Sequence, residues 1–289
     1  MKKIYADNID LDTYKLWIDK QITTKEYSKL LGLTSSQLYR LLKYKNLVGV
    51  THKVRSNVNH FYFNDVNSED KAYLLGFFAA DGNLNAKNDF HISVSESDFY
   101  ITELYRNFLS PYTPISESKS RNFHLNGKDY VTKSMKMFSV RSTHICDALR
   151  NFGFVENKTQ KEFVVPELGE FTRHFIRGYF DGDGTISFSK NPRKNHINNT
   201  YTFAITCHTD SILRSISNHF NNNVGVSGRV AQYKGNYVLT ICGRENTYQV
   251  LSYLYKDSTY RLERKYDKYL QIVEDRNLRL EQLKAANDN

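Results

Sequence analysis

The sequence predicts an α+β fold in which two similar αββαββα halves follow a small, entirely helical module. Three observations support this prediction. An apolar helix that ends in Asp-Gly occurs twice, at residues 73–82 and 175–184. Each copy precedes a stretch in which apolar and polar residues alternate, as in a half-buried strand. Arg141 follows Asp81 by 60 residues and Arg244 follows Asp183 by 61 residues. This matched spacing indicates a duplicated unit.

Length and composition limit the class of protein. A chain of 289 residues suggests about two domains. Its net charge of +9 fits a polyanionic partner such as nucleic acid. The three cysteines are far apart and form no CxxC pair, so we expect no zinc site and a reducing compartment. Without a signal peptide or a membrane-length apolar run, the chain is expected to be soluble and intracellular, in the cytoplasm or nucleoid, with no membrane partner.

Residues 1–65 are expected to form a separate module with its linker. Two T-x-x-E/Q capping boxes, at Thr23 and Thr34, mark two helix starts with Gly32 between them. Two short helices around a glycine turn resemble a helix-turn-helix. In that interpretation the second helix would carry Gln37, Arg40 and Lys43 toward DNA. The alternative is a small helical bundle that makes no nucleic-acid contact.

The duplicated helix itself predicts a metal site. Gly76 stands four residues before Ala80, and Gly178 stands four residues before Gly182, so each helix presents a bare stripe. Two such stripes allow close packing of the helix backbones. If the helices are parallel, Asp81 and Asp183 meet at one end, each followed by a glycine that is typical of helix ends. Two adjacent carboxylates need a cation between them, and their oxygens suit Mg²⁺.

The first half is assigned to residues 66–166. After the helix, residues 90–95 alternate as a strand, and a helix led by Asp98 follows. Asn126-Gly127 is a hairpin signal, and residues 137–142 form a strand that leads into a helix at 144–152.

The second half is assigned to residues 167–289 and repeats this order. Residues 201–208 form a strand, and a helix led by Asp210 follows. A hairpin turn at 234–236 joins strands 228–233 and 237–242, which are followed by a helix at 246–255. A charged helix, roughly residues 259–284, ends the chain.

The duplicated motif resembles that of the LAGLIDADG homing endonucleases. The second copy keeps Gly178 and Asp181-Gly182-Asp183-Gly184, and the first keeps Gly76 and Asp81-Gly82 with Ala79 at the inner acidic position. The resemblance covers about residues 68–272. It implies that the motif helices form the interface between the halves, and that the two sheets form a saddle that binds DNA.

The resemblance also implies a mechanism. Asp81 and Asp183 would each bind Mg²⁺, or Mn²⁺ in its place, with help from the carbonyl groups of Ala80 and Gly182. Each metal would serve one strand, with scission across the minor groove leaving 3′ overhangs. The family places a basic residue near the metals, usually lysine, and Arg141 and Arg244 stand at those places. Lys158, Lys256 and Lys265 are alternatives for this role.

The polar members of the strands and hairpins are the candidate DNA contacts, because strand ribbons can enter the major groove. They are His91, Ser93, Arg121, Lys136, Thr202, Thr206, His208, Arg229, Gln232 and Lys234.

The function expected from this resemblance is intron homing by a site-specific DNA endonuclease. It would act as a monomer and hydrolyse both strands of a long, asymmetric double-stranded target. Two alternatives share the fold: a maturase that binds intron RNA, and a DNA-binding regulator without catalysis. The presence of both outer aspartates, Asp81 and Asp183, argues against the regulator, because a regulator does not need two carboxylates close together.

Overall fold

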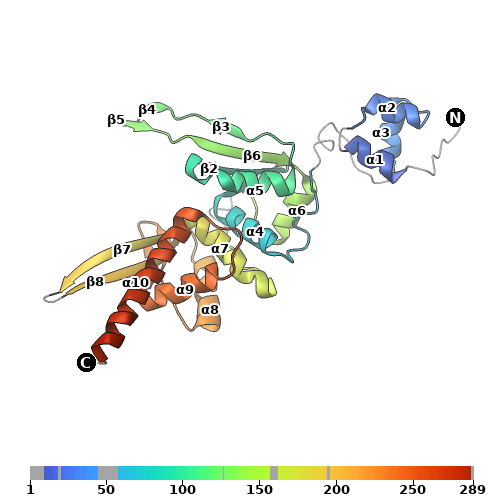
Figure 1. Cartoon of the computed structure of the whole chain (residues 1–289). Coiled ribbons are helices and arrows are strands. Elements are labelled where there is room, and N and C mark those ends of the chain that lie inside the picture. The colour runs from blue at the N-terminus through green and yellow to red at the C-terminus, as the bar shows by residue number, and fades with distance from the viewer. Residues whose placement is uncertain are drawn as a thin grey trace.

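The computed structural model describes residues 10–18, 21–44, 58–125, 127–156, 162–193 and 196–287. The described part contains three N-terminal helices and a larger body made of two halves (Figure 1). None of its helices combines the length and the apolar character that crossing a membrane requires.

The first half begins with helix α4 and is built around a four-stranded antiparallel sheet in the order β1-β2-β6-β3. Strands β4 and β5 form a separate two-stranded ribbon at the end of the β3–β6 hairpin. The elements are α4 (Glu69–Asp81), β1 (Gly82–Leu84), β2 (Asp89–Ser95), α5 (Phe99–Leu109), β3 (Ser116–Ser118), β4 (Asn122–Leu125), β5 (Lys128–Val131), β6 (Met135–Arg141) and α6 (Thr143–Asn151).

The second half has a sheet in the equivalent order, β7-β8-β10-β9, which confirms the predicted pair of αββαββα units. It differs in which hairpin is long: here β7 and β8 are extended, whereas the first half extends the β3–β6 hairpin. Both arms reach out on the same side in Figure 1. The elements are α7 (Thr172–Asp183), β7 (Gly184–Arg193), β8 (His196–Cys207), α8 (Ser211–Val224), β9 (Arg229–Tyr233), β10 (Asn236–Cys242), α9 (Arg244–Tyr255) and α10 (Glu263–Asn287).

The two halves meet where α4 packs against α7 with almost no side chain between the backbones. A Cβ atom placed on Gly76 would lie 1.9 Å from the carbonyl oxygen of Phe175. A Cβ atom on Gly178 would lie 2.0 Å from the carbonyl oxygen of Tyr73. Any side chain larger than hydrogen at either position would therefore push the halves apart.

The glycines that end these helices have a different role from the expected helix cap. Gly82 and Gly184 have φ of −77° and −88°, in the extended region that any residue adopts. A Cβ atom on Gly82 would lie 2.0 Å from Cδ2 of Phe78, and one on Gly184 would lie 2.1 Å from Cδ2 of Phe180. Both glycines are therefore required because an aromatic ring from the preceding turn covers them.

One hydrophobic core runs through both halves, and it begins with Tyr62 and Phe63, just before α4. In each half a ring from the motif helix stacks on a ring from the second strand. Phe78 stacks on Phe90 with centroids 5.0 Å apart, and Phe180 stacks on Phe203 at 4.4 Å. These matched contacts fix each sheet against its own motif helix.

The N-terminal helices have their own small core of Trp17, Tyr27, Leu38 and Leu42. They are α1 (Leu11–Ile18), α2 (Thr24–Leu30) and α3 (Ser35–Tyr44). Both capping boxes form. Glu26 Oε2 accepts from the Thr23 amide at 2.6 Å, and Gln37 Oε1 accepts from the Thr34 amide at 2.8 Å. Gly32 supplies the turn with φ of +63°.

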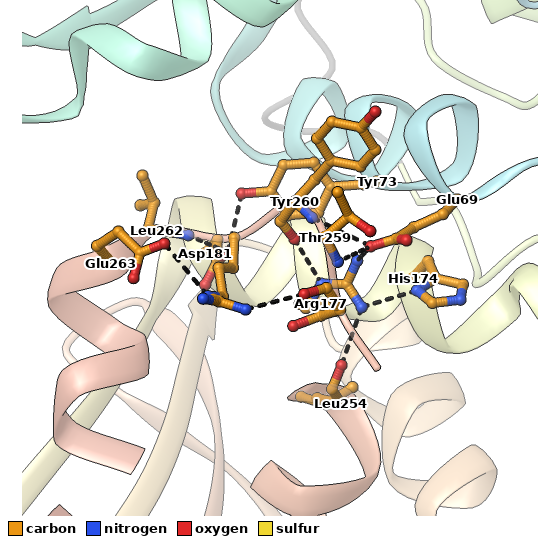
Figure 2. A network of polar contacts seen from close by, with 12 residues as sticks. Glu69, Tyr73, His174, Arg177, Asp181, Leu254, Thr259, Tyr260, Leu262 and Glu263 are labelled. Carbon is orange, nitrogen blue, oxygen red and sulfur yellow. Dashed lines mark hydrogen bonds and ion pairs between the residues drawn. The ribbon is translucent and has the colours of Figure 1, made fainter. Parts of the chain in front are cut away.

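A buried ion pair ties the first half to the second and to the segment before α10 (Figure 2). Arg177 of α7 is fully buried, and its Nη2 donates to Glu69 Oε1 of α4 at 2.6 Å. The same oxygen accepts the amides of Thr259 and Tyr260 at 2.7 and 3.1 Å. The segment that carries these two amides is not helical, and α10 begins at Glu263, later than the expected start near Thr259.

Replacing Gly178 with alanine should destabilise the protein. Helix propensity alone would stabilise an alanine variant by about 1 kcal/mol. The clash with the Tyr73 carbonyl should outweigh this and lower the free energy of unfolding by about 1–3 kcal/mol, the usual range for overpacking. Urea denaturation of wild-type and Gly178→Ala protein measures this difference. A rise in stability would show that the helix contact has room for a methyl group.

Candidate functional site

Asp81 and Asp183 are the last residues of α4 and α7, and the parallel packing of these helices brings their ends together. A Cβ atom on Gly182 would lie 2.3 Å from the Ala80 Cβ and 3.3 Å from Oδ2 of Asp81. The Asp81 carboxylate therefore reaches the last turn of α7, one residue from Asp183. Asp81 is exposed and Asp183 is half-buried, so solvent or a ligand can reach both.

A cleft of about 320 Å³ opens beside the paired helix ends, with Asp183 in its wall. Its walls come from both halves: the end of α4, the last turns of α7, and the region where β8 ends. The lining residues are Ala79, Ala80, Phe163, Tyr179, Asp183, Thr206, Cys207, His208 and Asn236. The sequence did not predict that Tyr179 would line this cleft, because an apolar helix gives no sign of which aromatic residue faces a cleft.

The inner aspartate of the second motif, Asp181, has a structural role (Figure 2). Its carboxylate is buried and accepts from the hydroxyl group of Tyr73 at 2.9 Å, as drawn in Figure 2. The hydroxyl group of Tyr255 also donates to it, at 3.0 Å. It also accepts from the amide of Leu262 at 2.9 Å. Burial raises the pKa of Asp181, while the nearby charge of Lys265 opposes that rise. Asp181 therefore holds the segment before α10 against α7.

Lys265 is a basic side chain that lies beside the end of α7. It is buried, and its Nζ donates to the carbonyl oxygens of Phe180 and Asp181 at 2.6 and 2.7 Å. Burial lowers the pKa of Lys265 to about 8, and the charges of Asp181, Asp183 and Asp81 oppose that shift. Lys265 is thus within electrostatic reach of both outer carboxylates.

The structure does not bring Arg141 to the aspartates. Strand register places Gly82 level with Ile92 of β2, and Ile92 level with Phe138 of β6. Arg141 stands three residues beyond Phe138, about 10 Å along the strand. There it makes two hydrogen bonds to Asp89, at 2.6 and 2.9 Å.

Arg244 is also held away from the aspartates. Gly184 is level with Ile205 of β8, which is level with Leu239 of β10. Arg244 lies five residues beyond Leu239, at the start of α9, and its Nε is 2.8 Å from Oδ2 of Asp275. The motif helices end level with the middle of each sheet, whereas Arg141 is the last residue of β6 and Arg244 follows β10.

The predicted polar contacts lie mainly on one face of each sheet. His91 and Ser93 occupy the half-exposed face of β2, alternating with buried residues. Thr202 and Thr206 occupy the equivalent face of β8, and His208 follows the end of that strand. Arg229 of β9 is exposed and level with Thr240, which is level with Ala204 on the same face as the two threonines.

Two residues that were predicted to contact DNA lie on the opposite face of their sheets. Lys136 is level with the buried Val94 and is therefore on the helix-covered face of its sheet. There it pairs with Glu117 at 2.7 Å and lies 5.6 Å from the ring centroid of Phe99. Gln232 is three residues from Arg229, so strand alternation places it on the opposite face of β9.

The remaining predicted contacts lie in turns and in the N-terminal module. Arg121 is exposed between β3 and β4, and Lys234 stands in the β9–β10 turn with φ of +49°. Arg40 is exposed on α3, whereas Gln37 uses its carbonyl oxygen in the capping box. The side chain of Lys43 and all of Lys158 lie outside the described residues.

Comparison with solved structures shows the fold. The LAGLIDADG homing endonuclease I-SmaMI bound to cleaved DNA superposes with a TM-score of 0.50 at 11% identity, covering 70% of this chain and 87% of that one. The LAGLIDADG meganuclease I-AabMI bound to uncleaved DNA has a TM-score of 0.48 at 13% identity, covering 73% and 91%.

A curated protein also matches part of the sequence. The DNA-directed RNA polymerase subunit Rpo1C of Methanocaldococcus jannaschii is 30% identical over 120 residues, which is 41% of this chain. The match spans only 13% of the length of that subunit.

Residues 170–255, which run from just before α7 to the end of α9, match the model of the LAGLIDADG-like domain. This range includes Gly178, Asp181 and Asp183. The chain therefore contains a LAGLIDADG-like domain, and its two halves together have the fold of a LAGLIDADG homing endonuclease.

Proposed function

We propose that the chain is a site-specific DNA endonuclease that cuts both strands of a long, asymmetric duplex with divalent metal ions. The observation that carries this proposal is the pairing of Asp81 and Asp183, one from each half, at the ends of two parallel helices. The two sheets beside this pair each present a polar, half-exposed face. A nuclease needs such a combination of a charged centre and a surface that contacts DNA.

The donor set fits Mg²⁺. The C-termini of α4 and α7 add partial negative charge to the two carboxylates, which favours a cation there. Within the described ranges, no three His, Cys, Asp or Glu side chains converge on a metal position. The other ligands would be the Ala80 and Gly182 carbonyl oxygens, waters and phosphate oxygens, an arrangement that suits Mg²⁺, with Mn²⁺ as an alternative. A bound ion would supply charge stabilisation for the leaving oxygen and lower the pKa of bound water.

The residues of this chain divide the remaining tasks. Each half brings one outer aspartate, so each strand of the duplex would be served by its own carboxylate. Lys265 would place positive charge near the phosphate in the transition state. Because the site is partly buried, this charge would interact more strongly with the phosphate than it would in water. The polar sheet faces would hold the duplex in register through base edges and phosphates.

An asymmetric target follows from the differences between the halves. The long hairpin comes from β3–β6 in the first half and from β7–β8 in the second. His91 and Ser93 face the solvent on β2, whereas Thr202 and Thr206 do so on β8. Two halves with different contact residues cannot read identical half-sites, so one copy would bind one non-palindromic site.

Substituting either outer aspartate should abolish cleavage but not binding. Asp81→Asn and Asp183→Asn each keep the side-chain shape and remove the charge that would hold a metal ion. We expect double-strand cleavage in Mg²⁺ to fall by about 10²–10³-fold or more, a typical loss for a charge-stabilising group in an active site. Cleavage assays with gel-shift binding in parallel measure both effects.

Asp147→Asn is the matched control for these variants. Asp147 lies on α6 and pairs on the surface with Arg150 at 2.8 Å, so its loss should leave cleavage unchanged. If Asp81→Asn or Asp183→Asn cleaves both strands at the wild-type rate, the substituted aspartate is not part of the proposed metal site.

Lys265, and not Arg141 or Arg244, should be the basic residue that cleavage requires. Lys265→Met keeps the length of the side chain and removes its charge, and it should reduce cleavage by about 100-fold or more while DNA binding persists. Arg141→Ala and Arg244→Ala remove ion pairs far from the aspartates and should keep cleavage within about tenfold. A large loss of cleavage in an arginine variant that still binds DNA would show that this arginine has the catalytic role.

The N-terminal module is proposed to bind the DNA backbone without taking part in the chemistry. Its core of Trp17, Tyr27, Leu38 and Leu42 is separate from the main core, so removal of residues 1–57 should leave the two halves folded. Each phosphate that the truncated protein no longer neutralises should reduce the salt slope of binding by about 0.9. We therefore expect weaker binding and a flatter slope, with cleavage retained at high protein concentration. Unchanged affinity and slope would make this module a helical appendage only.

A further inference from the structure

The β4–β5 ribbon carries apolar side chains that lie outside the main core. Phe123, Leu125 and Tyr130 are 44%, 53% and 44% exposed. Register places Phe123 opposite Tyr130, and their rings stack with centroids 5.4 Å apart and an angle of 20° between the ring planes. Leu125 is two residues from Phe123 and therefore lies on the same face. These three side chains form one exposed surface, here called the ribbon face.

Strand register assigns the ribbon face to one side of the β3–β6 hairpin. From Lys136 the hairpin keeps one register through the backbone bond between Arg121 and Thr132, at 2.9 Å, and into the ribbon. Because side chains alternate along each strand, the ribbon face is on the same side as Lys136, which is the helix-covered side of the sheet. His91 and Ser93, the candidate duplex contacts of this half, are on the other side.

The side of the hairpin that carries the ribbon face is basic. The same alternation puts Lys119, Arg121 and Lys128 on this side, and all three are exposed. Within the described part of the hairpin, Glu117 is the one acidic residue on this side, and Lys136 pairs with it at 2.7 Å. The surface around the ribbon face therefore attracts a polyanion.

Exposed aromatic rings among lysine and arginine side chains are typical of surfaces that bind single-stranded nucleic acid. On such surfaces the cations contact the phosphates, and unpaired bases stack on the rings. Base pairs inside a duplex offer no free face for stacking, because their neighbours cover them. A protein partner fits less well, because lysine is depleted at protein–protein interfaces.

We propose that the ribbon face is a stacking platform for the unpaired bases of single-stranded nucleic acid, with Lys119, Arg121 and Lys128 beside its phosphates. In Figure 1 the ribbon extends beyond the sheet, away from α4 and its terminal aspartate. The platform is therefore separate from the candidate metal site, and the inference does not rest on the proposed endonuclease function.

Oligonucleotides with and without bases test this proposal. Binding of the full chain to an oligodeoxyuridylate of about 20 nucleotides, long enough for one binding site, is measured in EDTA. An abasic oligonucleotide of the same length keeps the phosphates and removes the bases. We expect the wild-type chain to bind the oligodeoxyuridylate more tightly than the abasic oligonucleotide. Phe123→Ala/Tyr130→Ala should lose about tenfold or more of the affinity for the oligodeoxyuridylate and bind the abasic oligonucleotide as the wild-type chain does.

Oligouridylate of the same length distinguishes the two sources of this ligand, because it differs from oligodeoxyuridylate only in its 2′-hydroxyl groups. Tighter binding of oligouridylate would identify RNA as the ligand, and tighter binding of oligodeoxyuridylate would identify single-stranded DNA. In both cases the loss in the alanine variant should be seen with the preferred oligonucleotide.

Two further variants are the matched controls. Phe123→Tyr/Tyr130→Phe keeps both rings and should keep the wild-type affinity. Tyr233→Ala removes an exposed aromatic side chain from β9 of the other half and should also bind as the wild-type chain does. The alanine variant should keep its thermal unfolding temperature, because both substituted residues lie outside the main core, and should bind duplex DNA with unchanged affinity.

Several results would overturn this inference. Equal wild-type affinity for the oligodeoxyuridylate, the oligouridylate and the abasic oligonucleotide would do so, as would an alanine variant that loses no affinity. An equal loss of duplex binding in that variant would assign the ribbon face to the duplex. A loss of self-association without a base effect would assign it to a second copy of the chain. Absence of endonuclease activity would overturn only the proposed function, because no measurement here depends on cleavage.

Discussion

The direct contact between the α4 and α7 backbones determines how the two halves of the molecule are arranged. Gly76 and Gly178 let each helix touch a carbonyl oxygen of the other, so the halves meet without intervening side chains. Because the helices run in parallel, this contact also brings Asp81 and Asp183 to the same end. Two carboxylates and two helix C-termini then share one small region, and this concentration of negative charge is what the proposed metal ion would neutralise. The packing of the halves and the proposed chemistry therefore have one physical origin.

The buried charges around this contact are stabilised by one another. Arg177 is fully buried and needs Glu69, because removing one partner of a buried pair leaves an uncompensated charge. Asp181 receives two tyrosine hydroxyls and a backbone amide, and Lys265 donates to the last turn of α7. Glu69 belongs to the first half, Arg177 to the second, and both bond to the segment before α10. This network sets the position of Lys265 and so links the C-terminal helix to the candidate site.

The two sheets share an architecture but present different surfaces. Equivalent strand order places a polar face beside the aspartates in both halves, yet the long hairpin and the exposed side chains differ. The first half adds the exposed β4–β5 ribbon, and the second half adds the extended β7–β8 arm. Duplication thus explains the symmetric centre, while divergence of the arms explains how one chain could read an asymmetric target.

The duplicated fold could be predicted from the sequence, because the signals for it are local. Each of these signals depends on residues that are close together in the sequence. They are the helix ends at Asp81 and Asp183, the alternation of apolar and polar residues in 90–95 and 201–208, and the two capping boxes. Features that depend on distant partners emerged only in the folded chain. The bond between Asp181 and Leu262 holds Lys265 close to the end of α7, a position that no local sequence pattern indicates. Arg141, the last residue of β6, and Arg244, which follows β10, pair with other carboxylates instead. Lys136 lies on the helix-covered face because its strand register places it level with Val94, a relation between strands that neither segment encodes alone.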